Sequence, residues 1–281
     1  MTRHLAPLAL ALLFIFACNT QSKDHWQLAK NEYAARDFLG CILEINLYLE
    51  NHAPSDSVLV LRAHCYNRVE KHEKAAKDLL HALQLNPTSL GAKLEFARLL
   101  AYQGDTLAAL RHLTLPSTKQ SGHIVSEFLL ERALLLFYTK KPDESLQCLH
   151  QAIQADSTNP DAWFLRGAFY SSSLVDSLKN FLQPQQAVKD FEKAITLNPR
   201  YAEAYFKLAQ TQLNILKDTL QGMKNLSYAI QLDSHNAGFY LVRAKWHILR
   251  KDFISARRDF NTVLNLNPLD STAHAGLKQL Q

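Results

Sequence analysis

Small and large apolar residues recur along this chain at offsets that suit paired helices. A small residue occupies one recurring position at intervals of 34, 34, 36, 34, 42 and 35 residues. The residues at this position are Ala29, Ala63, Ala97, Ala133, Gly167, Ala209 and Ala244. Helical patterns surround them, so each marks the first helix of a predicted pair.

A second small residue follows each of these twelve positions later, with eight extra residues in the fifth unit and one in the sixth. These residues are Cys41, Ala75, Ala109, Ser145, Ala187, Gly222 and Ala256. Four positions further on lie the bulky residues Ile45, Leu79, Leu113, Leu149, Phe191, Leu226 and Phe260. Two helices that approach closely need small residues at the crossing and bulky ones beside it. The pattern therefore predicts seven helical hairpins.

One type of hexapeptide closes most of these hairpins. AITLNP ends at Pro199, and ALQLNP and VLNLNP end at Pro87 and Pro268. AIQADS and AIQLDS take the same place, ending at Ser157 and Ser234. Proline cannot continue a helix and pushes its predecessor into extended geometry. The hexapeptide therefore predicts the end of the second helix in each unit.

These positions together resemble the tetratricopeptide repeat, a helix–turn–helix unit of 34 residues. The best-matched unit contains Trp163, Gly167, Tyr170, Ala187, Phe191, Ala194 and Pro199. The resemblance implies an all-α, right-handed superhelical solenoid of about seven units and a C-terminal capping helix. The expected units are residues 22–55, 56–89, 90–125, 126–159, 160–201, 202–236 and 237–270, with the cap at 271–281, so that the solenoid covers 24–281.

Two units depart from the pattern. Pro116 occupies a position that holds alanine elsewhere, so the second helix of the third unit should end near Thr114, with a loop and a changed superhelical angle after it. The fifth unit carries an insertion within residues 171–186, whose apolar residues share one helical face. We expect its first helix to run on or restart past the normal turn. The insertion would either pack on the neighbouring repeat or dock a partner.

An arginine before the first small residue is matched by an aspartate before the bulky residue in three units. The predicted ion pairs between paired helices are Arg62–Asp78, Arg166–Asp190 and Arg243–Asp259. Desolvation offsets much of the attraction in such a pair, so it specifies packing more than it adds stability.

The first residues have the form of an export signal. Arg3 precedes a 13-residue apolar stretch that is too short to span a bilayer, and Cys18 follows it. IFAC resembles the lipobox of bacterial lipoproteins, which implies a signal peptide at 1–17, acylation of Cys18 and a tether at 18–23. The alternative is an ordinary signal peptide with an incidental cysteine. This resemblance implies a location in the cell envelope. In enteric bacteria an aspartate directly after the cysteine retains a lipoprotein in the inner membrane, so Asn19 at that position favours the outer membrane.

Composition narrows the class of protein further. Apolar residues make up 47% of the 281, with 8 Gly and 9 Pro, and the net charge is +5. This cationic bias is mild and unclustered, so nucleic acid is not an expected partner. Cys41, Cys65 and Cys148 fall inside helical patterns without metal-ligand spacing, which predicts buried, apolar roles for them.

The sequence contains no recognised catalytic or cofactor motif. Phosphate-binding loops, nucleophile elbows and HExxH are all absent, and the histidines lack ligand partners at helical spacing. We therefore expect no enzyme activity, no cofactor and no metal.

A surface on the first helices is then the best candidate site. In the family that this chain resembles, the first helices line a concave groove. The corresponding residues here are Trp26, Lys30, Tyr33, His64, Arg68, Arg98, Tyr102, Phe137, Tyr138, Phe164, Phe206, Gln210 and Lys245. Basic and aromatic side chains suit a protein or peptide segment with apolar anchors and acidic flanks. Alternatively, some of these aromatics pack between adjacent first helices.

Function is expected to follow from this surface. The leading hypothesis is a non-catalytic scaffold for protein–protein interaction, held on the cell envelope by acyl chains on Cys18. An envelope protein that binds a small ligand or glycan is the alternative, and it would need a closed pocket with converging polar groups.

Overall fold

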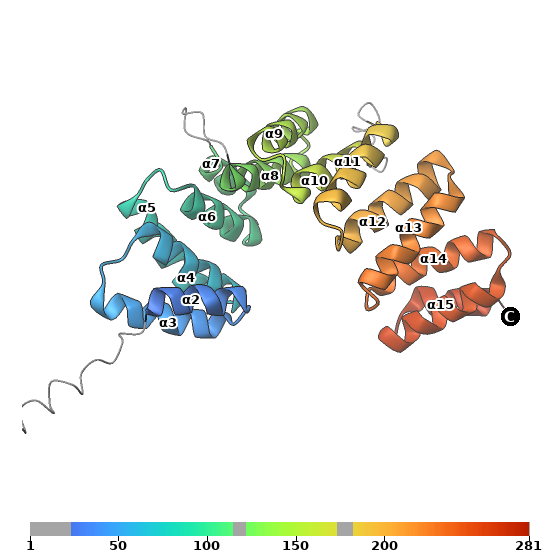
Figure 1. The fold of residues 1–281 in the computed structure, drawn as a ribbon, viewed down its shortest axis with the longest axis horizontal. Coiled ribbons are helices and arrows are strands. Elements are labelled where there is room, and N and C mark those ends of the chain that lie inside the picture. Colours follow the sequence, from blue (N-terminus) through green and yellow to red (C-terminus); the bar gives the residue numbers. More distant parts are fainter. Residues whose placement is uncertain (1–23, 115–121, 173–181, 281) are drawn as a thin grey trace, which may run out of the picture. The chain divides into compact units, whose positions relative to one another are not determined.

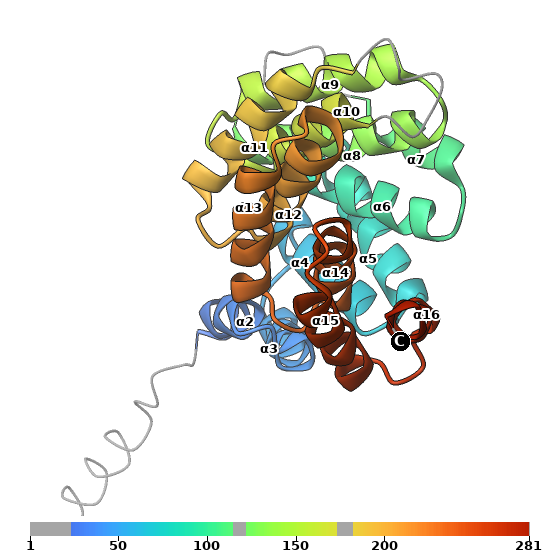
Figure 2. The same ribbon diagram turned by 90° about the vertical axis from the view of Figure 1, so that its right-hand side faces the viewer.

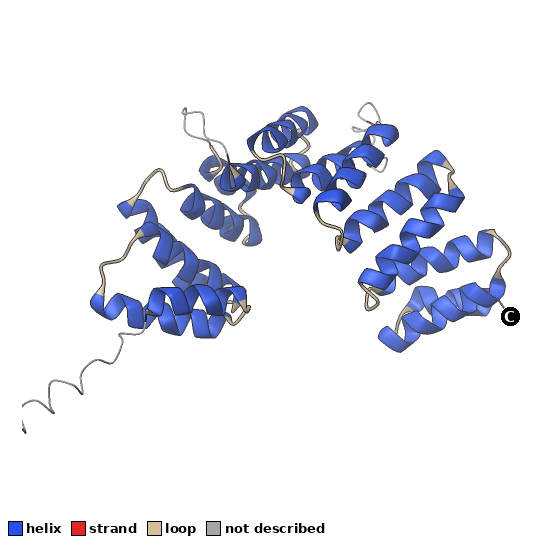
Figure 3. Cartoon of the chain, viewed as in Figure 1, coloured by secondary structure: helices blue, strands red, loops and turns tan. Residues whose placement is uncertain are grey.

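The computed structural model describes residues 24–114, 122–172 and 182–280. Within these ranges every regular element is helical and no strand occurs (Figure 3). The predicted all-α repeat fold is confirmed. The predicted signal peptide, Cys18 and its tether lie outside the described residues, as do Pro116 and most of the insertion in the fifth unit. No helix in the described ranges is long and apolar enough to cross a bilayer.

The helices pair in chain order within two compact units, Met1–His112 and Leu113–Gln281. The first unit contains three hairpins (Figure 1). They are α2 (His25–Ala34) with α3 (Phe38–Asn51), α4 (Asp56–Arg68) with α5 (His72–Leu85), and α6 (Leu90–Tyr102) with α7 (Thr106–His112).

The second unit contains four hairpins and a closing helix, and the helices of its last two hairpins lie side by side in both views (Figures 1 and 2). The hairpins are α8 (His123–Tyr138) with α9 (Pro142–Ala155), α10 (Pro160–Ser171) with α11 (Pro184–Leu197), α12 (Ala202–Gln210) with α13 (Thr219–Leu232), and α14 (Ala237–Leu249) with α15 (Phe253–Leu266). Helix α16 (Ser271–Gln279) follows, and a π-helical segment, η2 (Thr211–Leu216), extends α12.

The repeated hexapeptide has a clear physical role at the ends of α5, α9, α11, α13 and α15. Its Asn or Asp accepts a hydrogen bond from the backbone N–H two residues on, at 2.9 to 3.3 Å. The residues that do so are Asn86, Asp156, Asn198, Asp233 and Asn267. This turn gives a partner to a backbone N–H beyond the helix, and it turns the chain toward the next hairpin.

The recurrent small and bulky residues form the core. All three sets of positions are buried, and the glycine members lie directly against a bulky neighbour. A Cβ at Gly167 would lie 2.9 Å from a ring carbon of Phe191, so helices α10 and α11 approach more closely than alanine allows. The predicted crossing of small against large residues is therefore present in every hairpin.

The three predicted ion pairs are confirmed, and each is a two-bonded fork. Nε and Nη2 of the arginine donate to the two carboxylate oxygens at 2.7 to 2.9 Å. The side chain of Asp190 is fully buried and that of Arg166 is 15% exposed. Arg132 has no aspartate at the matching position and donates instead to the carbonyl of Leu113 at 2.8 Å.

The predictions for the two units that depart from the repeat differ in how well they agree with the structure. Helix α7 ends at His112, close to the predicted end near Thr114. Helix α10 does not run on past the turn as expected, because it ends at Ser171 and Ser172 is extended. The possible restart falls on residues 173–181, outside the described range. Pro184 opens α11, where the absent N–H leaves no helical bond unmade.

The single extra residue of the sixth unit produces the π-helix that the sequence analysis did not predict. In a π-helix the backbone hydrogen bonds join residues five apart instead of four, so one turn contains an additional residue. In η2 this lets Leu213 stay in the core, where it is fully buried against Gly222. The insertion is thus absorbed inside the helix rather than in the turn after it.

The three cysteines among the described residues are buried, as predicted, and form no disulfide with one another. Cys41 and Cys65 hydrogen-bond to each other, and this contact together with burial raises the pKa of the Cys65 thiol. Burial likewise raises the pKa of the Cys148 thiol. The hydrogen bond with Cys65 lowers the pKa of the Cys41 thiol. All three side chains are buried and pack as small residues within the helical core.

Candidate functional site

The predicted surface residues divide between the two units. Helices α2, α4 and α6 of the first unit carry the first seven of them, and α8, α10, α12 and α14 of the second unit carry the other six.

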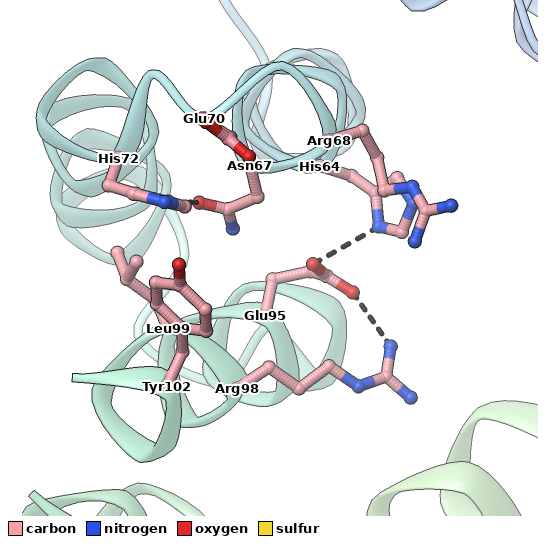
Figure 4. Close-up of a pocket in the computed structure, with 9 residues that line it drawn as sticks. All are labelled: His64, Asn67, Arg68, Glu70, His72, Glu95, Arg98, Leu99 and Tyr102. Carbon is pink, nitrogen blue, oxygen red and sulfur yellow. Dashed lines mark hydrogen bonds and ion pairs between the residues drawn. The ribbon is translucent and has the colours of Figure 1, made fainter. Parts of the chain in front are cut away.

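A cavity of about 330 Å³ opens between the first helices α4 and α6 and the start of α5 (Figure 4). Four of the predicted surface residues line it, namely His64 and Arg68 of α4 and Arg98 and Tyr102 of α6. The complete lining is His64, Asn67, Arg68, Glu70, His72, Glu95, Arg98, Leu99 and Tyr102.

Glu95 lies in this cavity between two of the predicted basic residues (Figure 4). Its Oε2 is 3.1 Å from His64 Nδ1, and its Oε1 accepts a hydrogen bond of 2.8 Å from Arg98 Nη1. Burial opposes ionisation, but the bond and charge of His64 and the charge of Arg98 outweigh it, so the pKa of Glu95 lies below its ordinary value. The carboxylate therefore neutralises part of the basic surface that the sequence predicted.

Glu95 is not among the residues predicted from the sequence. It lies two residues before Ala97, a position filled by Leu61 in the second hairpin and Leu165 in the fifth. The signal in the sequence was a glutamate on the buried side of the helix, where the matching hairpins have leucine. An acid at a buried position needs a cationic partner, and the preceding hairpin supplies one in His64.

The outer part of the same surface retains free positive charge. The guanidinium of Arg68 lies 5.3 Å from the ring centre of Phe38, and Lys30 Nζ lies 5.5 Å from that of Trp26. No carboxylate of the described residues lies within ion-pair distance of Arg68 or Lys30. These two cations are stacked on aromatic rings but not neutralised.

Two tyrosines contact histidines that line the cavity, and one of them, Tyr102, lines it as well. Tyr33 meets the ring of His64 edge-on at 5.4 Å, and Tyr102 lies 4.8 Å from the ring of His72. Tyr102 is 74% exposed, although one of its faces is covered. Tyr102 can therefore add apolar contact area to anything bound in the cavity.

The second unit has an apolar cavity of about 330 Å³ between α8, α9 and α10. Predicted residues Phe137 and Tyr138 line it, and Tyr138 is 75% exposed. Lys207 also lines this cavity and a neighbouring polar one of about 250 Å³, which contains the predicted Gln210. An apolar side chain and an acidic or amide group could be bound next to each other here.

Three predicted aromatics contribute to packing instead. Phe206 stacks on Phe239 of the next first helix at 4.5 Å, and Phe164 lies 5.0 Å from Tyr201. Trp26 packs against Tyr48 of its own hairpin at 6.0 Å. Contacts between adjacent hairpins, the alternative that the sequence left open, account for Phe164 and Phe206. Lys245 is exposed on α14 and forms no ion pair with a carboxylate among the residues that the structure describes.

The described part of the chain holds no group of three or more His, Cys, Asp or Glu side chains arranged to bind a metal. Side-chain polar atoms that are buried there all have hydrogen-bond partners. What the described surface offers is cations, aromatic edges and shallow cavities.

Replacing Glu95 by glutamine is expected to reduce the loss of stability at acid pH. Because its folded pKa is depressed, ionised Glu95 stabilises the folded state above the ordinary glutamate value of about 4.3 and loses this effect as the pH falls through the depressed pKa. Urea midpoints at about pH 7 and about pH 3.5 measure this. Glu73→Gln, at an exposed position, is the control. An equal pH dependence in both variants would contradict the assignment.

Comparison with known proteins places this geometry in a known fold. Residues 56–89, the range of α4 and α5, match the family model described as Tetratricopeptide repeat. Tetratricopeptide repeat protein 16 of Mus musculus is 26% identical over 259 residues, which cover 88% of this chain and 30% of that protein. The chain spans about a third or less of the curated relatives that it matches.

Solved structures agree at the level of the fold. The Cut9–Hcn1 hetero-tetramer structure of the APC/C matches with a TM-score of 0.70 at 15% identity, covering 97% of this chain and 51% of that chain. The Pseudomonas aeruginosa pilF structure matches with a TM-score of 0.63 at 18% identity, covering 80% of this chain and 97% of that chain.

Proposed function

We propose that this chain, which is built of tetratricopeptide repeats, is a non-catalytic scaffold that binds a segment of a partner protein on its first helices. The cavity between α4 and α6 is the observation that supports this function best. It combines the exposed ring of Tyr102 with the unneutralised cation of Arg68. Aromatic residues and arginine are the types that most often contribute the main binding energy in protein interfaces.

The charges in this cavity define the partner chemistry. Glu95 already satisfies His64 and Arg98, so an incoming acidic side chain would pair with Arg68 or, along the same surface, with Lys30. An apolar side chain would contact Leu99 and Tyr102 on the cavity wall. The proposed partner is therefore a peptide segment with an apolar anchor and an acidic neighbour.

A different surface, in the second unit, could make the same kind of contact with a partner segment. Its cavity is lined by Leu134, Phe137 and Tyr138, with Lys207 at one side. An apolar anchor in this cavity would bury surface that is now in contact with water. We propose that it binds a second part of the partner or a second partner segment.

The cell-envelope location belongs to the proposal and rests on the sequence alone. The apolar stretch before Cys18 and the IFAC motif support export and acylation, with the outer membrane favoured. Two or three acyl chains are enough for stable anchoring, whereas one is not. The short tether would keep the repeats near the bilayer, and a membrane-proximal partner would follow.

Site-specific photocrosslinking in intact cells tests the scaffold function. A crosslinker at position 102 or 138 is expected to capture a discrete protein, whereas one at Leu80, half exposed on the second helix α5, is not. Arg68→Glu should lower the yield at position 102 at least about fivefold, the size expected for a residue contributing ~1 kcal/mol. Cys18→Ala should lose fatty-acid labelling and move the chain out of the membrane fraction.

Each outcome tests a separate part of the proposal. Equal capture by crosslinkers at positions 102 and 80 would show that the first-helix surface is not the binding site. No capture at either cavity would favour the small-ligand or glycan alternative. Fatty-acid labelling that survives Cys18→Ala would remove the anchor and leave the scaffold standing.

A further inference from the structure

One short motif occurs twice on consecutive hairpins of the second unit without any role in the proposed function. KDTLQGMK covers residues 217–224, and KDFISARR covers residues 251–258. Each joins a first helix to a second helix. Each begins with a lysine, continues with a capping aspartate and an exposed aliphatic residue, and ends with a cation four residues after that aliphatic residue.

The aliphatic residues in these motifs protrude into water. Leu220 is 77% exposed and Ile254 is 78% exposed, and Leu249 beside the second motif is 69% exposed. In the second and fourth hairpins the equivalent residues are Glu73 and Asp143, which suit the positive end of a helix. Folding therefore accepts an acid at this position and does not require the aliphatic residue, although exposed leucines, Leu39 and Leu107, also occupy it in the first and third hairpins.

Positive charge surrounds the same side chains. The two motifs and the residue before the second contain six cations: Lys217, Lys224, Arg250, Lys251, Arg257 and Arg258. Their only carboxylates are Asp218 and Asp252, and both cap their helices by accepting backbone hydrogen bonds of 3.1 Å. None of the six cations forms an ion pair with a carboxylate among the residues that the structure describes.

Both motifs lie on the same edge of the second unit. Helices α12 and α14 pack side by side through Phe206 and Phe239, so the turns that follow them project in the same direction. Lys217 and Lys251 hold equivalent left-handed conformations, with φ of 61° and 59°. The two turns therefore repeat one arrangement of cation and aliphatic side chain on neighbouring hairpins.

We propose that this edge, formed by residues 217–224 and 249–258, is a contact surface for an anionic lipid bilayer. A protein interface needs a closely packed apolar core, whereas the aliphatic side chains of this edge protrude into water among cations. A fluid interfacial layer accepts such side chains singly, and anionic headgroups attract cations without a fixed geometry. The contact is independent of the partner cavities and of acylation at Cys18.

A polarity-sensitive fluorophore on an introduced cysteine tests this contact. The full chain carries Cys18→Ser, and the other three thiols are buried, so labelling is confined to Ile254→Cys or to the control Leu269→Cys. Leu269 is 89% exposed, lies after the opposite end of α15 and has an aspartate neighbour instead of cations. The label at 254 is expected to shift to the blue with phosphatidylcholine vesicles that contain phosphatidylglycerol, but not with phosphatidylcholine alone. The label at 269 should not shift with either.

A matched charge reversal completes the test. Lys251→Glu should weaken binding to the anionic vesicles about five- to 25-fold, since each cation near such a surface is worth about fivefold. The turn tolerates glutamate, because Glu70 holds the same left-handed position with φ of 59°. Lys140→Glu makes the same change in the fourth hairpin, where Asp143 replaces the aliphatic residue, and should have little effect.

The remaining outcomes would overturn the proposal. A shift that is equal at 254 and 269, or equal on neutral and anionic vesicles, would mean that other segments bind the vesicles. A shift that rises with protein concentration in the absence of vesicles would assign the edge to a second copy of the chain. The partner cavities would be unaffected in every case, because no substitution touches them.

Discussion

Replacing Asp190 by alanine is expected to lower the free energy of unfolding by about 3–5 kcal/mol, the usual cost of removing one member of a buried ion pair. Asp190 is fully buried and accepts bonds of 2.8 Å from both Nε and Nη2 of Arg166, with a third bond of 2.9 Å from Gln186. The alanine variant leaves the guanidinium inside the hairpin without an acceptor. Urea unfolding followed by far-UV circular dichroism measures the loss.

Two control variants distinguish the cost of leaving a buried charge unpaired from the cost of losing the contact itself. Asp78→Ala should cost less, because Arg62 retains a bond of 2.9 Å to Asn46 and is slightly more exposed. The double replacement Arg166→Met with Asp190→Leu should be close to neutral, since no charge remains buried. A cost below about 1 kcal/mol for Asp190→Ala would show that water reaches the guanidinium.

Replacing Gly167 by alanine is expected to destabilise the chain by about 1–2 kcal/mol, although alanine favours a helix over glycine by ~1 kcal/mol. The added Cβ would lie 2.9 and 3.0 Å from ring carbons of Phe191 and 3.2 Å from the carbonyl of Ala187. Overpacking of this kind typically costs about 1–3 kcal/mol, which exceeds the gain in helix propensity.

Phe191→Leu should rescue this variant. Other hairpins already combine alanine with a smaller residue at these two positions, as Ala63 and Leu79 do, and both of these are fully buried. The double variant is therefore expected to be more stable than the sum of the two single effects predicts, with a coupling of about 1 kcal/mol. Strict additivity in urea unfolding would mean that the backbone, not the ring, yields to the new Cβ.

Much of the fold could be predicted because each hairpin repeats the same local pattern. The small residues at the crossing, the Asn or Asp before the turn and the Arg–Asp pairs all concern one helix and its immediate partner. Such contacts are set by spacing along the chain, and seven examples make the spacing readable. The end of α7 near Thr114 followed from a single proline for the same reason.

The site was less predictable because it depends on contacts between hairpins. Glu95 meets His64 across two first helices, and Phe206 is covered by Phe239 of the next hairpin. Whether an aromatic on a first helix is open or covered depends on the angle at which the next hairpin packs. Tyr102 and Tyr138 are exposed and Phe164 is not, although all three occupy first helices with similar patterns.

By itself, the sequence determined the helical hairpins, their order, their stop signals and the partners within each pair. These follow from periodicity and from residue types whose backbone preferences are local. Only the tertiary structure decided that Glu95 neutralises part of the basic surface, that one extra residue becomes the π-helix η2 and that two cavities open beside exposed tyrosines. Those features arise where one hairpin meets the next, and burial and electrostatics there depend on distances that no spacing along the chain specifies.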